Sequence, residues 1–149
     1  MTITTPPIDF MFDDGGRAEA GYLGTCGDCV VRAIAIATMR PYQEVYDALN
    51  LLAQRERRIK GRRSNSHTGV RRSTCDPYMR GVGWTWTPTM KIGQGCQVHL
   101  RAAELPSGRL IVSLSKHWAA VIDGCVHDLS DPSRDGLRCV YGYWHAPSI

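Results

Sequence analysis

One run of eleven residues, from Cys29 to Met39, limits the possible folds of this chain more than any other segment. It is apolar at nearly every position and contains several alanines. Such a stretch is typical of a helix that is buried on most of its faces, so other elements must cover it from several sides. Thr25 and Asp28 are good N-cap residues, and they place the beginning of this helix close to Cys29.

The segments around this run predict helices first and strands later. Pro41 opens a second helix with an apolar stripe, and a weaker third helix is expected over residues 69–80, where Pro77 disturbs it. Residues 1–24 are rich in glycine and predict an irregular arm, whereas residues 57–68 lack apolar periodicity and predict a loop. The later part of the chain predicts strands over residues 84–86, 110–114, 117–122, 125–128 and 138–144.

Helices followed by strands indicate an α+β domain in which a helical half packs on an antiparallel sheet. The length of 149 residues fits one domain over residues 1–149. The first ten residues carry no basic residue, and no apolar run approaches the ~20 residues of a membrane span. We therefore expect a cytoplasmic protein that does not enter a membrane. In that compartment cysteines are reduced and mostly buried, which applies to Cys26, Cys29, Cys75, Cys96, Cys125 and Cys139.

Basic residues are concentrated in the segment 55–72, which holds eight of the 18 lysines and arginines against a single acid, Glu56. The net charge of +4 therefore comes from this segment and not from the whole surface. Such a segment can attract an acidic protein or the phosphates of a nucleic acid, although a solvated loop has the same composition. The candidate partner-binding residues are Arg55, Arg57, Arg58, Lys60, Arg62, Arg63, Arg71 and Arg72.

Cys29 lies where a reactive thiol is favoured, at the expected N-terminus of the buried helix. The free backbone N–H groups and the dipole of a helix N-terminus stabilise negative charge, which lowers the pKa of a thiol there. The same N–H groups can hold the oxyanion of an acyl-transfer reaction. A buried cysteine that merely begins a helix would look the same in the sequence, so position alone does not make Cys29 a nucleophile.

Two strand-like runs, His117 to Ile122 and Cys125 to Asp128, are separated only by Asp-Gly, which is a strong signal for a two-residue hairpin. That register places His117 and Asp128 on one face as diagonal neighbours, with backbones about 7–8 Å apart. His127 points to the opposite face. Asp128 is therefore the expected partner that orients the imidazole of His117, which leaves the second ring nitrogen to act as a base. Spacing does not establish that this nitrogen meets Cys29.

The sequence Cys-Gly-Asp-Cys-Val-Val-Arg-Ala, residues 26–33, resembles the start of the active-site helix in papain-like cysteine peptidases. The papain branch has a small residue and an aromatic residue where this chain has Asp28 and Val30. Residues 116–124, with Asp128 after them, are similar to the histidine strand and the following acid of that superfamily. The likeness is to small bacterial or phage members such as the bacteriocin-leader peptidase-like group, and the residues around the cysteine are also similar to ovarian-tumour-type deubiquitinases.

The resemblance implies a papain-like fold and a cysteine-dependent hydrolase that cleaves a peptide or isopeptide bond. Cys29 would be the nucleophile, His117 the general base and acid, and Asp128 the orienting residue. No cofactor is implied. The partner would be a peptide or protein substrate, and small residues such as Gly27 favour an extended, glycine-rich or ubiquitin-like tail.

One departure from the family concerns the oxyanion. Papain-like enzymes usually place a glutamine about six residues before the cysteine, where this chain has Leu23. The near-site candidates that remain are Thr25, Asp28 and Trp118. Losing one oxyanion donor can cost ~10²–10³ in rate, so weak activity or a catalytically inactive papain-like protein is also consistent with the sequence.

Three other readings stay open. Cys26 and Cys29 form a C-x-x-C pair, which suits thiol–disulfide exchange, although no strand is expected before it. A zinc site would need Cys26 and Cys29 together with some of Cys125, His117 and His127, and no second close pair of ligands exists. A binding protein without catalysis would use the basic segment 55–72, and aromatic residues near it could grip single-stranded nucleic acid.

Overall fold

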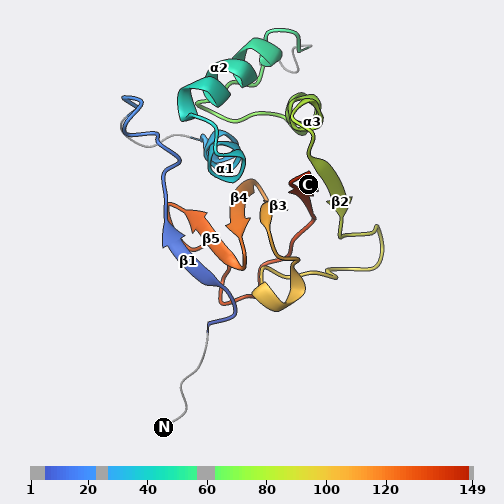
Figure 1. The fold of residues 1–149 in the computed structure, drawn as a ribbon. Coiled ribbons are helices and arrows are strands. Elements are labelled where there is room, and N and C mark those ends of the chain that lie inside the picture. Colours follow the sequence, from blue (N-terminus) through green and yellow to red (C-terminus); the bar gives the residue numbers. More distant parts are fainter. Residues whose placement is uncertain (1–5, 23–26, 57–62, 148–149) are drawn as a thin grey trace.

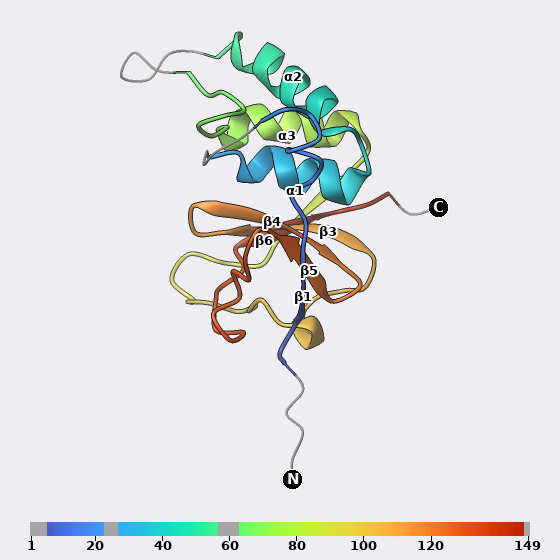
Figure 2. The same ribbon diagram turned by 90° about the vertical axis from the view of Figure 1, so that its left-hand side faces the viewer.

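The computed structural model describes residues 6–22, 27–56 and 63–147, and within them three α-helices lie on one side of a six-stranded sheet (Figure 1; Figure 2). None of the helices in these ranges is long and apolar enough to cross a membrane. The helices are α1 (Cys29–Thr38), α2 (Tyr42–Ala53) and α3 (Arg72–Gly81), with a short 3-10 helix, η1 (Ala102–Glu104). The strands are β1 (Asp9–Phe12), β2 (Thr85–Pro88), β3 (Arg109–Leu114), β4 (His117–Ile122), β5 (Cys125–Asp128) and β6 (Gly142–His145). The α+β class predicted by the order of the segments is confirmed.

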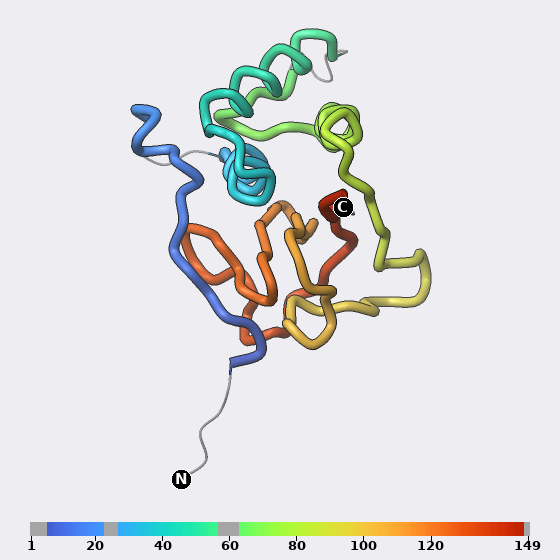
Figure 3. Tube along the Cα trace, in the orientation of Figure 1, coloured from blue at the N-terminus to red at the C-terminus, as the bar shows by residue number. Residues whose placement is uncertain are grey.

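The sheet has the order β1-β5-β4-β3-β6-β2, and every neighbouring pair is antiparallel except β1 with β5. The predicted irregular arm is therefore wrong for residues 9–12, and the sheet is not purely antiparallel. Figure 3 shows this N-terminal stretch running alongside β5. All four side chains of β1 are exposed, so no alternation of apolar residues marks it in the sequence. It forms because the outer edge of β5 presents backbone groups that need partners.

The helix α1 lies at the centre of the helical layer and packs on β4 and β3. Its residues from Val30 to Ala37 are all buried, as the composition of the run predicts. On the sheet side of this core, Trp118 and Ala120 of β4 belong to the same cluster as α1. Ala119 and Val121 point the other way and join a second cluster on the far face of the sheet. The strand β4, which begins at His117, is thus covered on both faces.

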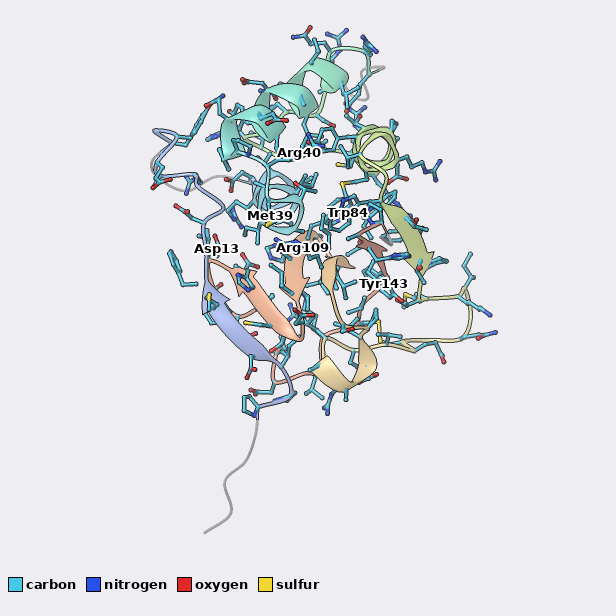
Figure 4. The ribbon with its side chains drawn as sticks, in the orientation of Figure 1. Asp13, Met39, Arg40, Trp84, Arg109 and Tyr143 are labelled. Atoms are coloured by element: carbon cyan, nitrogen blue, oxygen red, sulfur yellow. A yellow bond between two sulfur atoms is a disulfide. The ribbon has the colours of Figure 1, made fainter. Side chains whose placement is uncertain are left out.

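Arg109 of β3 connects the sheet to the C-terminal end of α1. Its Nε donates a hydrogen bond to the carbonyl of Ala37 at 2.6 Å, and its Nη2 donates to that of Ile36 at 3.0 Å. Carbonyls at a helix C-terminus lack intrahelical donors and carry partial negative charge, so a guanidinium is well placed there. Figure 4 shows Arg109 at the boundary between the sheet and the helices. This contact fixes the end of α1 opposite to Cys29.

The last predicted strand is shorter than expected. The strand β6 begins only at Gly142, because residues 138–140 instead hydrogen-bond with residues 98–100. In the same place Cys139 forms a disulfide with Cys96, so the expectation of reduced cysteines is wrong for this pair. The two residues are 43 positions apart and their Cα atoms are 5.8 Å apart, a separation that a disulfide can bridge. Pairing of two distant loops, which spacing does not reveal, brings them together.

The third helix forms as predicted but begins at Arg72, three residues later than the sequence suggests. Pro77 lies inside it. Trp84 precedes β2 and is buried, and the ring of Trp86 lies 5.4 Å from that of Trp144. Trp84 belongs to the core around α1, and the half-buried Trp86 packs against that core. These two side chains therefore have a packing role.

Candidate active site

The thiol of Cys29 lies at the N-terminus of α1, as the sequence predicts, and the residue is half-buried. The backbone N–H groups of the first turn of a helix have no intrahelical acceptor, so they favour a negative charge at this point. The preceding turn is close-packed, because the N–H of Gly27 donates a 2.8 Å hydrogen bond to the carbonyl of His67. A Cβ on Gly27 would lie 2.7 Å from the carbonyl oxygen of Thr68, so only glycine fits.

The β4–β5 hairpin has the predicted register. Ile122 pairs with Cys125, and Ala120 pairs with His127. The two turn residues between the strands have left-handed backbones, with φ of 46° at Asp123 and 76° at Gly124, as a tight hairpin turn requires. The first and last residues of this hairpin are those with a proposed chemical role.

His117 and Asp128 meet across the two strands. The His117 Nε2 donates to the Asp128 Oδ2 at 2.6 Å. His127 lies on the alternate face, where its Nδ1 is 3.3 Å from the Oδ2 of Asp13. Figure 4 shows Asp13 at the edge of the sheet where β1 ends. The structure therefore confirms that the hairpin pairs His117 with Asp128 and keeps His127 away from both.

The structure also brings His117 to Cys29, which the sequence could not establish. His117 and Cys29 line the same cavity and interact electrostatically, each shifting the pKa of the other. Since Nε2 is occupied by the carboxylate, Nδ1 is the ring nitrogen left for the sulfur. The three groups therefore follow one another in the order carboxylate, imidazole and thiol.

The electrostatics of this chain favour a charged pair. Burial raises the pKa of Cys29, but the hydrogen bonds from His117 and from the backbone N–H of Trp118 outweigh it and lower the pKa overall. Burial lowers the pKa of His117, but the hydrogen bonds to Asp128 and Cys29 raise it to about 9. Burial raises the pKa of Asp128, but the contact with His117 outweighs burial and lowers the pKa overall. A thiolate facing an imidazolium is the form that these shifts stabilise.

Arg32 contacts Asp128 from the buried side of α1, and sequence reasoning missed this residue. This arginine is buried in α1, ion-paired to Asp28 at i−4, and its Nη2 lies 3.5 Å from the Oδ1 of Asp128. The hydroxyl of Tyr42 donates to the second oxygen of Asp28 at 2.6 Å. The signal in the sequence was a charged pair within a run of apolar residues, since such a pair must be buried with its partners.

These contacts correct the list of near-site candidates. The carboxylate of Asp28 is buried and held by Arg32 and Tyr42, so it is not an oxyanion donor but part of the support beneath the site. The indole of Trp118 is buried in the core, and only its backbone N–H reaches the sulfur. Thr25 lies outside the described residues, as do Leu23 and Cys26.

A cavity of about 370 Å³ opens beside the thiol. One wall is formed by Thr68, Gly69 and Val70. The turn before them is held by backbone pairing of Asn65 with Gly69 and by two N–H groups that donate to the Asn65 side chain. The other wall is the turn between β3 and β4. Lining residues include Gly27, Cys29, Thr68, Gly69, Leu114 and His117. The thiol therefore borders a hollow to which two glycines, Gly27 and Gly69, contribute.

The described part of the basic segment 55–72 is largely engaged within the molecule. Arg71 makes an ion pair with Glu56 at 3.2 Å, and the guanidinium of Arg72 lies 4.0 Å from the centre of the Trp86 ring. Arg63 donates to the carbonyl of Glu56 at 3.1 Å. Arg55 is exposed. The remaining predicted partner-binding residues, Arg57, Arg58, Lys60 and Arg62, lie outside the described residues.

Comparison with known proteins adds no family: no protein-family model, no curated protein and no solved structure matches this chain. Among the described residues, no group of three or more His, Cys, Asp or Glu side chains could hold a metal ion. The predicted zinc set is divided, because His127 contacts Asp13 while His117 contacts Asp128. The predicted redox pair includes Cys26, which lies outside the described residues.

Proposed function

We propose that this protein is a papain-like, cysteine-dependent hydrolase that cleaves a peptide or isopeptide bond. One observation carries the proposal. His117 is hydrogen-bonded to the carboxylate of Asp128 and lies beside a half-buried thiol at a helix N-terminus, with which it interacts electrostatically. A nucleophile, a base and a group that orients the base are the parts that covalent acyl chemistry requires.

Each residue has a defined role in this reaction. The Cys29 thiolate attacks the carbonyl carbon, and the protonated His117 then gives its proton to the leaving amine as the C–N bond breaks. Water attacks the resulting thioester, His117 takes a proton from it, and the acid leaves as the thiol re-forms. Asp128 holds the ring in place and stabilises its positive charge throughout. An amine acceptor in place of water would give acyl transfer with the same three residues.

The backbone at the start of α1 is the proposed oxyanion site. Its N–H groups point toward the thiol end of the helix and lack intrahelical acceptors. The Trp118 N–H is already directed at the sulfur, so it stabilises the thiolate. Because Leu23 replaces the usual glutamine, we expect a turnover rate lower by about 10²–10³ than that of an enzyme with both donors.

The substrate we propose is an extended peptide with small residues at the scissile bond. The thiol opens into the cavity between residues 68–70 and the β3–β4 turn, and Gly27 and Gly69 both line that cavity. A glycine-rich or ubiquitin-like tail fits this requirement by size. The proposed reaction needs no cofactor.

The decisive experiment measures the thiol pKa of Cys29 from pH-dependent alkylation by iodoacetamide with peptide mass mapping. Wild type is compared with His117→Gln, and His127→Gln is the matched control on the same hairpin. Rapid alkylation of Cys29 well below pH 8 that is lost only in His117→Gln would support the hydrolase. An ordinary thiol that is indifferent to His117 would instead leave the alternative, an inactive papain-like protein that binds an acidic protein or nucleic acid through segment 55–72.

A further inference from the structure

A second cavity, of about 640 Å³, adjoins the candidate active site on the other side of His117. It shares Lys116 and His117 with the cavity beside the thiol, but Cys29 lines only the first cavity. Its other walls come from the segment 129–141, which connects β5 to β6. His117 therefore borders both cavities.

Three cations line the second cavity, and one acid opposes them. Lys116, Arg134 and Arg138 provide the positive charge, and Asp131 provides the negative charge. Within the described ranges, none of the three cations forms an ion pair with an acidic side chain. The Asp131 carboxylate is turned to the backbone N–H of Ser133, from which it accepts at 2.9 Å. The cavity therefore has an excess of positive charge beside His117.

Arg138 is held in place by the backbone, but one nitrogen of its guanidinium has no acceptor among the described residues. Its Nη2 donates to the carbonyl of Ser115 at 2.6 Å, yet its Nε is buried and has no acceptor in the described part of the chain. Burial lowers the pKa of Arg138, and the neighbouring charge of Arg134 lowers it further, against the charges of Tyr141 and Asp128. Two guanidinium groups that repel each other gain when an anion binds between them.

The backbone around Arg134 is rigid enough to hold such a site. Arg134, Asp135 and Gly136 all have left-handed φ, of 51°, 54° and 77°. The bend is closed by hydrogen bonds from the N–H groups of Gly136 and Arg138 to the carbonyl of Ser133, at 3.0 and 3.1 Å. The disulfide at Cys139 then anchors the next residue along the chain. Arg134 and Arg138 therefore belong to a fixed loop.

The position of the second cavity relative to His117 and Cys29 indicates which half of a substrate would lie in it. In acyl transfer to a cysteine, the histidine gives its proton to the leaving group, so the leaving group lies on the histidine side of the sulfur. The second cavity touches His117 and not Cys29, and it is thus on the leaving-group side.

We propose that this cavity binds a carboxylate of the substrate on the leaving-group side of the scissile bond. The inference rests on the proposed hydrolase and deepens it, because it names the class of substrate: peptides with an acid just after the cleaved bond. Lys116, Arg134 and Arg138 bind the carboxylate. The acid is either an Asp or Glu side chain or a free C-terminal carboxylate, and both have the same chemistry.

Two aromatic disulfides of similar size test the charge of the cavity. Each reacts with Cys29 in one step: the thiolate attacks one sulfur, a new S–S bond forms, and an aryl thiolate leaves with the electron pair. The aryl thiolate that leaves from dithiobis(nitrobenzoate) carries an additional carboxylate, whereas the one that leaves from dithiodipyridine has no carboxylate. The measured quantity is the ratio of the two rate constants at Cys29, with peptide mass mapping to separate this thiol from the others.

We expect Arg134→Gln/Arg138→Gln to lower this ratio about tenfold, since two charges near the leaving group are lost. Because Arg138 also hydrogen-bonds to the backbone, the double variant could misfold. Two single variants that keep Arg138 therefore serve as further tests. Arg134 is exposed, and Arg134→Gln alone should lower the ratio about threefold. Lys116→Asn should do the same and suits the left-handed φ of 56° at that position. Arg40→Gln, which removes one exposed charge in α2's preceding loop, should leave the ratio unchanged.

Three blocked peptides then identify the source of the carboxylate by protecting Cys29 from dithiodipyridine. Protection by N-acetyl-glycyl-aspartyl amide, and not by its asparaginyl counterpart, indicates an acidic side chain. Protection by N-acetyl-diglycine indicates a free C-terminus. The same ratio in wild type and Arg134→Gln/Arg138→Gln, or no protection beyond the asparaginyl peptide, would overturn the proposal. Failure of the hydrolase itself is recognised separately, as a dithiodipyridine rate that does not change in His117→Gln.

Discussion

The β4–β5 hairpin and the segment 129–141 both border His117, but different interactions hold them. In the hairpin, a two-residue turn sets the register, and the register alone brings Asp128 to the imidazole. In the segment 129–141, hydrogen bonds to residues 98–100 and the Cys96–Cys139 disulfide set the position of the cations. Asp128, which contacts His117, is thus placed by local geometry, whereas Arg134 and Arg138 of the second cavity are placed by contacts between distant parts of the chain.

The largest expected effect comes from breaking the hairpin's chain of hydrogen bonds. We expect His117→Gln to slow alkylation of Cys29 at pH 6 by about 100-fold, because an ordinary thiol is almost fully protonated there. Asp128→Asn should slow it less but in the same direction. His127→Gln removes the hairpin's other histidine–carboxylate contact and should change the rate less than twofold. A similar loss in His117→Gln and His127→Gln would mean that the register does not select the base.

Breaking the disulfide tests the other region. We expect Cys96→Ser/Cys139→Ser to lower the free energy of unfolding by up to about 4 kcal/mol, because it releases a closed loop of 43 positions in the unfolded chain. Denaturant unfolding measures this change. The iodoacetamide rate of Cys29 should persist in the folded variant, while its preference for the carboxylate disulfide should fall as the segment 129–141 loosens. A variant that keeps both stability and preference would show that the disulfide is not what holds the cations.

The pH dependence of stability reports on His117 and its two partners, Asp128 in the hairpin and Cys29 in α1. His117 has a folded pKa of about 9, raised from 6.5, so its contribution is complete below pH 6.5 and is lost as the pH rises through 9. The shift corresponds to about 3 kcal/mol. We expect the stability difference between wild type and His117→Gln to be largest near pH 6 and to shrink by pH 10. Urea titrations at these two pH values measure it, and a constant difference would contradict the raised pKa.

The smallest effect concerns the turn that sets the register. Gly124 has a φ of 76°, and a Cβ there would lie 3.2 Å from the Cβ of Ala102. We expect Gly124→Ala to lower the free energy of unfolding by about 1 kcal/mol without altering the thiol pKa of Cys29. If the thiol pKa rises in this variant, the turn and the site are coupled more closely than the register implies.

Much of the fold and part of the site could be predicted from local patterns. The helix from Cys29, the hairpin from His117 to Asp128 and the opposite orientation of His127 all follow from periodicities of a few residues, and the structure contains them. The strand β1 could not be predicted, because its side chains are exposed and only its backbone pairs with β5. The ion pair between Arg32 and Asp128 could not be predicted either, since it joins a helix to a strand that is far away in the sequence.

The sequence by itself determined which residues could supply the proposed hydrolysis: a thiol at a helix start, and a histidine and an acid on one face of a hairpin. Turn geometry and helix dipoles act over a few residues, so they can be read directly from the chain. Only the tertiary structure decided that His117 meets Cys29, that Cys96 meets Cys139 and that Arg134 and Arg138 gather beside the imidazole. Those meetings depend on how α1 packs on β4 and how two long loops pair, and such packing is a property of the whole core.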